Sequence, residues 1–392
     1  MAGIKKHSDQ FKELVSPYLR QKIAEAEETF GPNSRELHAI TNQYFYDARE
    51  KIVDNRQNRR HYEAEMHPEF DGQPVLGIER LYRRTILIEP TLVCAAHCRW
   101  CLRGFYPAKT MKEDDITHAT RYIGSKELRD DVDEVLMTGG DPLMSLPLLA
   151  LTLGELTRNA PNIKTVRIGS RVPFQDPRRI NDDMISLFNR YSNFKFEIGV
   201  NVCHPIEFWP ESVEVLHKLQ NVGIRIYNQH PLLKGVNDDY ETLNELYDLV
   251  RQNGVEGHYL FHAIPIRGAA HHRTTLIDGA RLASLISSSG KFSGRTKPHY
   301  AVLSDIGKIV MYEGTILKRR EEDNAVLLQS GYRLEERLKW NPNWVQPESV
   351  EVDENGFMRT WYLDAAKELE NEIGQDTPDQ GKKNVVFLNG TN

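Results

Sequence analysis

Short apolar runs rich in β-branched residues recur through the middle of the chain and predict six strands. The segments between them have helical periodicity. In 239–251, for example, Leu243, Leu246, Tyr247 and Val250 follow the i, i+3, i+4, i+7 spacing of an amphipathic helix. The six runs are TILIEP (85–90), DEVLMTGG (133–140), KTVRIGS (164–170), KFEIGVNV (195–202), IRIYNQH (224–230) and HYLFHAI (258–264).

Strands that alternate with helices pair in parallel, because each crossover helix returns the chain to the same edge of the sheet. The alternation from about 84 to 290 therefore predicts an α/β fold. A partial, TIM-like (β/α)6 barrel and an open doubly wound sheet both satisfy this pattern, and we favour the barrel.

The two flanks of this core have different patterns. Residues 8–75 are polar and helix-like, whereas PHYAVLSDIGKIVMYEG predicts two strands joined at SDIG, a hairpin instead of a further strand–helix unit. The last residues are polar, and we expect them to be mobile. We divide the chain into a helical N-terminal region, a barrel core, a C-terminal hairpin with an accessory segment, and a polar tail: 1–75, 76–292, 293–373 and 374–392.

Composition excludes several classes of protein. The 392 residues are 40% hydrophobic and 27% charged, as in ordinary globular proteins. The sequence contains no run of about 18 apolar residues, so we expect no membrane span. The first residues, MAGIKKHSDQ, lack the apolar core of a secretory signal, so we expect a cytoplasmic protein. A net charge of −6 argues against nucleic-acid binding, which needs clustered Lys and Arg.

Polar loops follow the predicted strands. A cysteine-containing loop follows the first strand, and four further loops follow the next four: GGDP (139–142), GSR (169–171), NVCHP (201–205) and NQHPLL (228–233). In a parallel barrel all five would open on the face formed by the carboxyl ends of the strands, where active sites lie. We therefore expect one functional site built from these loops.

The first loop, CAAHCRWC, contains three of the four cysteines: Cys94, Cys98 and Cys101. Clustered thiols in a protein with no disulfide framework indicate metal binding or catalysis. A structural zinc ion needs a fourth ligand, which could be His97 or the distant Cys203. An iron–sulfur cluster usually takes four cysteines, so three would leave one iron free for a small molecule.

Several motifs in the same order give the chain a resemblance to the radical S-adenosylmethionine (SAM) superfamily, and more closely to the lysine 2,3-aminomutase family. They cover about 80–275, roughly half of the chain. The motifs are CAAHCRWCLRGF (94–105), TGGDPLM (138–144), VRIGSRVP (166–173), RRINDDMISLFNRY (178–191), CHPIE (203–207) and NQHPLLKGVND (228–238).

The resemblance implies that the three cysteines hold a [4Fe–4S] cluster whose open iron is chelated by SAM. An electron from a flavodoxin- or ferredoxin-type donor would then split SAM into a 5′-deoxyadenosyl radical, which abstracts hydrogen from substrate. Asp141 would lie near the methionine ammonium of SAM, and the glycines before it would allow close approach. Turn or cap chemistry is an alternative role for Ser170 and Asn201. The SAM-binding residues implied by the resemblance are Gly139, Gly140, Asp141, Ser170, Asn201 and Gln229.

The resemblance also implies that Arg103 pairs with the carboxylate of a small amino-acid-like substrate, since guanidinium presents a bidentate fork to carboxylates. A surface ion pair or a charge that stabilises the cluster are alternatives. Lysine-specific members hold the distant ammonium with aspartates, and one of these positions is Ile264 here. We therefore expect a substrate other than lysine.

Aminomutases also carry pyridoxal phosphate (PLP) on a lysine in a glycine-rich segment, which this chain lacks. One alignment places Lys308 at that lysine. The other alignment deletes the segment and leaves Lys308 as a strand lysine. We favour this second alignment because its strand pattern matches over a longer stretch. One phosphate-binding arginine of the family matches Arg179, whereas the other falls at Leu81, near Arg80 and Arg83.

Other residues near these motifs have two interpretations. A histidine group could carry protons or lie in ordinary loops, and Cys203 could be a buried thiol or a hydrogen donor facing SAM. The histidines are His258, His262, His271 and His272. A zinc-stabilised, non-catalytic barrel protein remains an alternative to a radical SAM isomerase with or without PLP. The N-terminal helices could pack against a second subunit.

Overall fold

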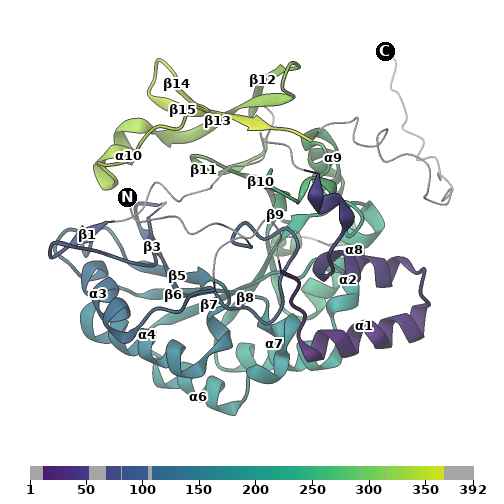
Figure 1. Cartoon of the computed structure of the whole chain (residues 1–392), viewed down its shortest axis with the longest axis horizontal. Coiled ribbons are helices and arrows are strands. Elements are labelled where there is room, and N and C mark those ends of the chain that lie inside the picture. Colours follow the sequence, from purple (N-terminus) through teal and green to yellow (C-terminus); the bar gives the residue numbers. More distant parts are fainter. Residues whose placement is uncertain are drawn as a thin grey trace.

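A nine-stranded, curved and open sheet forms the centre of the molecule, shown in the computed structural model of Figure 1. The structure describes residues 12–52, 68–80, 82–104, 108–292, 294–312 and 314–365. The strand order is β11-β10-β9-β8-β7-β6-β5-β4-β3, so neighbours in sequence are neighbours in the sheet. The two edge strands do not pair with each other, and the sheet is a half-barrel.

Six parallel strands form the predicted barrel core, and a helix follows each of them. The prediction of a partial (β/α)6 barrel is confirmed. The strands are β4 (Thr85–Thr91), β5 (Glu134–Gly139), β6 (Thr165–Ser170), β7 (Lys195–Val200), β8 (Arg225–Leu232) and β9 (Glu256–His262). The helices are α3 (Glu113–Ile123), α4 (Leu146–Asn159), α6 (Asp182–Arg190), α7 (Pro210–Asn221), α8 (Tyr240–Gln252) and α9 (Leu276–Ser287).

Alternation along each strand separates the two faces of the sheet. In β6, Val166 and Ile168 are fully buried in the main core, whereas Thr165 and Arg167, which alternate with them, are only partly buried. Side chains of a strand point alternately to opposite faces, so the apolar set meets the helices and the polar set lines the concave side. The concave side can therefore hold polar chemistry.

The sheet extends beyond the core at both edges. At one edge β3 (Ile78–Glu79) pairs antiparallel with β4. At the other, β10 (His299–Ser304) pairs in parallel with β9, and β11 (Gly307–Val310) returns antiparallel to β10. The predicted hairpin at SDIG is present. Its first strand pairs in parallel with β9 and its second strand returns antiparallel, so the prediction of a hairpin in place of a further strand–helix unit is confirmed.

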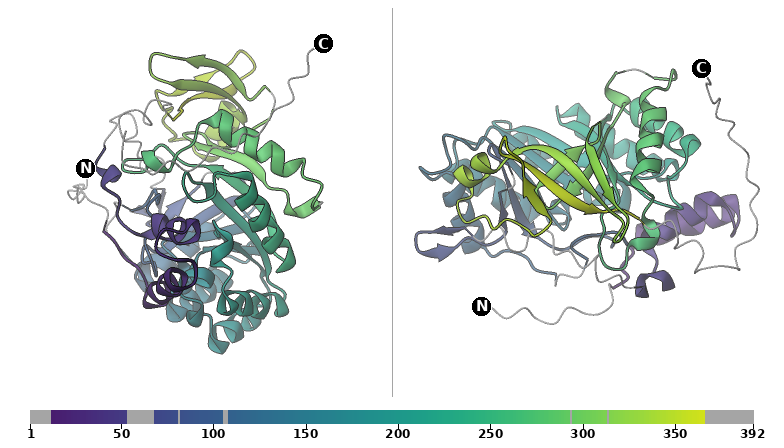
Figure 2. Two further views of the ribbon diagram at one scale, coloured as in Figure 1. Left: turned by 90° about the vertical axis from the view of Figure 1, so that its right-hand side faces the viewer. Right: turned by 90° about the horizontal axis from the view of Figure 1, so that it is seen from above.

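A second sheet packs on this hairpin and was not predicted from the sequence. Its four antiparallel strands have the order β12-β13-β15-β14, with α10 (Leu334–Trp340) after β13. Val302 and Ile309 of the hairpin pack with Val326 and Leu328 of the second sheet. Figures 1 and 2 show the second sheet beside the hairpin, away from α3–α8. Its strands are β12 (Ile316–Arg320), β13 (Ala325–Arg333), β14 (Val350–Val352) and β15 (Phe357–Leu363).

The N-terminal region is helical where the structure describes it, with a small hairpin before the barrel. Leu19 and Ile40 are fully buried in a cluster that includes Trp209, so the helices pack on their own barrel. The Ser16 hydroxyl donates to the Gln175 carbonyl oxygen (2.5 Å). The elements are α1 (Pro17–Phe30), α2 (Arg35–Tyr44), the 3-10 helix η1 (Ala48–Lys51), β1 (Glu69–Phe70) and β2 (Gln73–Pro74).

The remaining elements are short helices in the loops that follow the strands. They are η3 (Pro142–Met144), α5 (Val172–Gln175), η4 (Pro177–Arg179), η5 (Pro205–Glu207), η6 (Ala270–His272) and η7 (Gly294–Thr296). None of the helices in the described part of the chain has the length and apolar character needed to cross a bilayer. The predicted mobile tail, 374–392, lies outside the described residues.

Buried neutral histidine predicts how stability depends on pH. His230 is fully buried on β8, where its Nε2 hydrogen-bonds with Tyr247 Oη (2.9 Å), and burial lowers the pKa of His230 to about 4. The unfolded chain takes up a proton near pH 6.5 that the folded chain does not accept until about pH 4. The free energy of unfolding should therefore fall as the pH falls through this range.

Urea unfolding of the wild type and His230→Gln at about pH 7.5 and about pH 5 tests this expectation. The variant should be less stable at the higher pH because the Tyr247 contact is altered. It should then lose less stability on acidification, because one proton-linked group has been removed. Equal losses in both proteins would show that His230 does not contribute to the pH dependence.

Candidate functional site

The cysteine loop leaves β4 at the carboxyl edge of the sheet and is held by the N-terminal region. Cys94, Cys98 and Cys101 are all partly buried. The His97 amide donates to the Leu14 carbonyl oxygen (2.8 Å), and the Arg99 amide donates to that of Gln43 (3.0 Å). Residues far apart in sequence thus fix the loop through its backbone.

Side chains of the loop add to this attachment. The Arg99 guanidinium is fully buried in an ion pair with Glu50, and its Nε donates to Glu50 Oε1 (2.7 Å). His97 Nδ1 lies 2.8 Å from the Lys12 carbonyl oxygen. One ring nitrogen of His97, a candidate fourth zinc ligand, is therefore engaged by the backbone.

The donor set is of the kind that iron–sulfur clusters take. In the described residues, no three His, Cys, Asp or Glu side chains are arranged to hold one metal ion. A cubane cluster places each cysteine on a different iron, so its sulfurs are farther apart than the ligands of one ion. Thiolates are the ligands of iron–sulfur clusters. Three thiols on one loop match that requirement.

Burial and mutual repulsion raise the pKa values of two of the clustered thiols. Burial raises the pKa of Cys101 to about 11, and the neighbouring Cys98 charge adds to the effect. Burial, followed by the charges of Asp141, Cys101 and Cys98, raises the pKa of Cys94 well above its ordinary value. Three thiolates at this position therefore need compensating charge, which a metal centre or a nearby cation can supply.

Gly139 and Gly140 press against the segment that leads into the cysteine loop. Gly139 has φ +104°, and a Cβ on Gly140 would lie 2.5 Å from the carbonyl oxygen of Val93. The Gly140 amide donates to the Thr91 carbonyl oxygen (2.7 Å). The close approach that requires glycine is thus to the chain's own backbone, whereas the sequence led us to expect an approach to ligand.

Asp141 joins the loops after β5 and β6. Its Oδ1 accepts from the Ser170 hydroxyl (2.8 Å) and the Leu143 amide (3.0 Å), and its Oδ2 accepts from the amides of Arg171 (2.7 Å) and Val172 (3.1 Å). Burial raises the pKa of this carboxyl although these bonds oppose the rise. Asp141 and Ser170 lie together and are hydrogen-bonded to each other, and their predicted contact with SAM stays a prediction.

Arg171 lies at the centre of the site and was not identified as a site residue from the sequence. Its Nη1 donates to Cys98 Sγ (3.0 Å), and its Nη2 donates to Glu207 Oε2 (2.8 Å) and Gln43 Oε1 (2.9 Å). The guanidinium also lies 5.3 Å from the centroid of the Trp100 ring. Four separate segments therefore meet at one side chain.

Glu207 completes this buried network from the loop after β7. Its side chain is fully buried, and its Oε1 accepts from the amides of Cys203 (2.8 Å) and His204 (3.0 Å). The Cys203 thiol is buried and donates to Asn201 Oδ1 (3.3 Å), and burial raises its pKa well above the ordinary value. Cys203 is thus a buried thiol beside Asn201.

Gln229 differs from the other predicted SAM contacts because part of its amide is unused. It lies on β8, and its buried Oε1 has no hydrogen-bond partner. A buried acceptor without a partner costs free energy, which a ligand with a donor would recover. Gln229 is therefore suited to contact a ligand.

Arg103, the predicted substrate-binding residue, is already paired with acids. Its guanidinium forms ion pairs with Glu89 and with Glu79 (Nη2–Oε1 3.2 Å). Burial alone would lower the pKa of Arg103, but the two carboxylates raise it above its ordinary value. A substrate carboxylate would have to share or displace these partners.

The candidate PLP residues have other partners in the structure. Lys308 lies on β11 with its Nζ 5.1 Å from the centroid of the Tyr259 ring, and burial lowers its pKa to about 8. Arg179 pairs instead with Asp176 (3.0 Å), and no contact joins Arg179 to Lys308. Arg80 donates to the Trp340 carbonyl oxygen (3.1 Å). Leu81 lies outside the described residues.

The predicted histidines pack against aromatic rings, and buried ring nitrogens of His262, His271 and His272 have no hydrogen-bond partner among the described residues. His262 is fully buried, with its Nδ1 2.8 Å from Tyr300 Oη, and His272 packs edge-on against Trp100. His258 lies against the ring of Tyr227 on the neighbouring strand β8. His271 stacks against His272. None of these contacts involves the three clustered cysteines.

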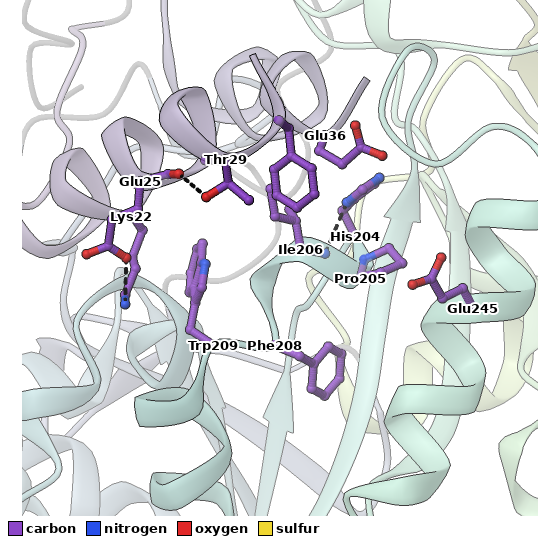
Figure 3. Close-up of a pocket in the computed structure, with 12 residues that line it drawn as sticks. Lys22, Glu25, Thr29, Glu36, His204, Pro205, Ile206, Phe208, Trp209 and Glu245 are labelled. Atoms are coloured by element: carbon purple, nitrogen blue, oxygen red, sulfur yellow. Dashed lines mark hydrogen bonds and ion pairs between the residues drawn. The ribbon is translucent and has the colours of Figure 1, made fainter. Parts of the chain in front are cut away.

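A pocket of about 440 Å³ lies between the N-terminal helices and the loop after β7 (Figure 3). Trp209 and Phe30 contribute apolar walls, while Glu36 and Glu245 contribute carboxylates. His204 reaches it from the loop that carries Glu207, with its Nδ1 accepting from the Ile206 amide (3.2 Å). The lining contains none of the cysteines.

Comparison with known proteins agrees with this geometry. A family model described as the Radical SAM superfamily matches residues 88–249. The chain is 32% identical over 239 residues to an L-lysine 2,3-aminomutase of Methanococcus maripaludis, covering 60% of this chain and 53% of that protein. It is 28% identical over 280 residues to the enzyme of that name in Acetoanaerobium sticklandii, covering 67% of each chain.

A third relative carries a different substrate in its name. The chain is 29% identical over 235 residues to a glutamate 2,3-aminomutase of Clostridioides difficile, covering 58% of this chain and 53% of that protein. In these three alignments the chain spans between 53% and 67% of the relatives' own lengths.

The contact at Gly140 predicts that a single methyl group will disturb the cysteine loop. Gly140→Ala would place Cβ 2.5 Å from backbone atoms that cannot move without shifting Val93. We expect a loss of about 1–3 kcal/mol in stability and reduced iron binding. The control is Gly290→Ala, where no atom lies within 4 Å of the added Cβ. Equal stability and iron content in the two variants would contradict this interpretation.

Proposed function

Because the chain belongs to the radical SAM superfamily, in its lysine 2,3-aminomutase-like group, we propose that it is a radical SAM enzyme acting on a small amino-acid-like substrate. A [4Fe–4S] cluster on Cys94, Cys98 and Cys101 would supply the electron that splits SAM into a 5′-deoxyadenosyl radical, which abstracts hydrogen from that substrate. The observation that carries the proposal is the group of three partly buried thiols at the carboxyl edge of β4, inside the matched segment. We expect it to work in the cytoplasm with a flavodoxin- or ferredoxin-type reductant.

The residues around the cysteines have separate tasks in this proposal. Gly139 and Gly140 allow the loop after β5 to hold the cysteine loop through two backbone hydrogen bonds. Asp141 and Ser170 keep the next two loops in register. The free acceptor of Gln229 would receive a hydrogen bond from SAM.

We propose a substrate with a carboxylate and without a distant ammonium group. Ile264 stands where lysine-specific members have an aspartate, so the chain offers no acid there for a second ammonium. Arg103 would bind the substrate's carboxylate in place of the carboxylate of Glu79 or Glu89, with which it now forms ion pairs. A relative named for glutamate supports a non-lysine substrate within this group.

The preferred form of the proposal has no PLP. Arg179 and Arg80 have other partners, and Lys308 belongs to a hairpin strand. PLP-dependent 2,3-aminomutation remains a second candidate because of one observation about Lys308. Among the described residues its Nζ forms no ion pair and lies over the rings of Tyr259 and Phe261, and burial lowers the pKa of this amine, which favours imine formation.

An anaerobic incubation with SAM, dithionite and a panel of deuterated amino acids tests the main proposal. Deuterium should enter 5′-deoxyadenosine with at least one carboxylate-bearing amino acid other than lysine. Replacing any of the three clustered cysteines by serine should abolish this transfer, whereas Cys203→Ser should retain the cluster. Zinc at one ion per chain without labile sulfide would instead favour the zinc-stabilised, non-catalytic barrel.

Borohydride trapping separates the two forms of the enzyme. After incubation with PLP, the wild type should give no pyridoxyl adduct at Lys308 by peptide mass spectrometry. Lys308→Met provides the background level of labelling on surface lysines. An adduct on Lys308 that is absent from the variant would replace the preferred form with the PLP-dependent one.

A further inference from the structure

We propose that Arg171 is a positioning residue that raises the reduction potential of the metal centre held by the three cysteines. The inference rests on the proposed function, because it requires a cluster on those sulfurs. It concerns a residue outside the predicted ligands, the predicted SAM contacts and the predicted substrate contact. Its basis is the contact between the Arg171 guanidinium and Cys98 Sγ.

The guanidinium is held through its two terminal nitrogens and lies between two aromatic rings, whereas its Nε has no hydrogen-bond partner among the described residues. It is nine-tenths buried, donates to Cys98 Sγ at 3.0 Å, and lies 5.3 Å from the ring centroids of both Tyr44 and Trp100. Burial by itself would lower the pKa of Arg171. The negative charges of Cys98, Tyr44 and Glu207 outweigh this effect and raise the pKa well above its ordinary value. The positive charge beside the sulfur is therefore permanent.

Cys98 Sγ accepts more side-chain hydrogen bonds than the sulfurs of Cys94 and Cys101. Besides Arg171, Gln175 Nε2 donates to its Sγ at 3.5 Å. No side-chain donor to Cys94 or Cys101 is found among the described residues. Hydrogen bonds to ligand sulfurs and nearby charge are among the factors that set cluster potentials. The positive charge and the side-chain hydrogen bonds are thus concentrated on the Cys98 side of the cluster.

Glu207 opposes the charge of Arg171 and makes the proposal testable in two directions. Its fully buried carboxylate lies 2.8 Å from Arg171 Nη2 and is held by two backbone amides. Reduction adds one negative charge to a cluster. A positive charge favours the reduced form and a negative charge disfavours it, since Coulomb interactions are strong in a buried site.

Two variants should therefore shift the potential in opposite directions. Arg171→Met removes the cation and the N–H···S bond, and should make the reduced form about tenfold less favourable, a fall of about 59 mV for a one-electron couple. Glu207→Gln leaves the cation less compensated and should raise the potential. Arg171→Lys keeps the charge but not the planar fork, and should fall between the wild type and Arg171→Met.

The measurement is an anaerobic redox titration of the reconstituted proteins, followed by EPR and normalised to iron and sulfide content. Arg99→Gln is the matched control, since Arg99 forms a buried ion pair on the same loop with Glu50 and does not contact a cysteine sulfur. Its potential should fall less than that of Arg171→Met, since Arg99 donates no hydrogen bond to a cysteine sulfur and its loss removes charge only. Iron content alone could change for structural reasons, whereas opposite shifts of potential could not.

The outcomes separate this inference from the proposed function. A wild type that cleaves SAM, with unchanged potentials in Arg171→Lys and Glu207→Gln, would overturn the inference alone. A wild type that forms no cluster would overturn the proposed function together with the inference. If Arg171→Met holds no cluster, a raised potential in Glu207→Gln and a lowered one in Arg171→Lys support the inference.

Discussion

The buried ion pair between Arg171 and Glu207 constrains every loop around the cysteines. Two charges removed from water cost several kcal/mol each, and hydrogen bonds to both partners offset part of that cost. The bonds come from Cys98, Gln43 and the backbone after β7. The cysteine loop, helix α2 and two strand ends must therefore assemble together, or a charge is left buried without a partner.

This constraint explains why the N-terminal helices belong to the site although they are outside the barrel. They cover one side of the cysteine loop through backbone contacts at His97 and Arg99, and α2 supplies Gln43. The loop after β5 holds the loop from the opposite side through Gly140 and Asp141. The sulfurs are thus positioned mostly by the backbone, and their immediate electrostatics are set by one arginine.

Much of the fold could be predicted from the sequence because its signals are local. Strand and helix periods repeat within each unit, and the cysteines, glycines and Asp141 lie in short motifs. Arg171 could not be assigned in this way, since its partner Gln43 is 128 residues distant. The second sheet was missed for a similar reason. Strands such as β12, in which no residue is buried and three of the five are charged, have a weak pattern without their neighbours. Glu79 and Glu89 likewise became partners of Arg103 only in the folded chain.

The central claim is that three cysteines leave one iron of a cluster open for SAM. EPR of the reduced, anaerobically reconstituted protein, recorded before and after SAM is added, tests it most directly. The signal of a [4Fe–4S] cluster should appear and should change on addition of SAM, because SAM becomes a ligand of the open iron. A cluster signal that SAM leaves unchanged, or a protein that binds no iron and sulfide, would contradict the claim.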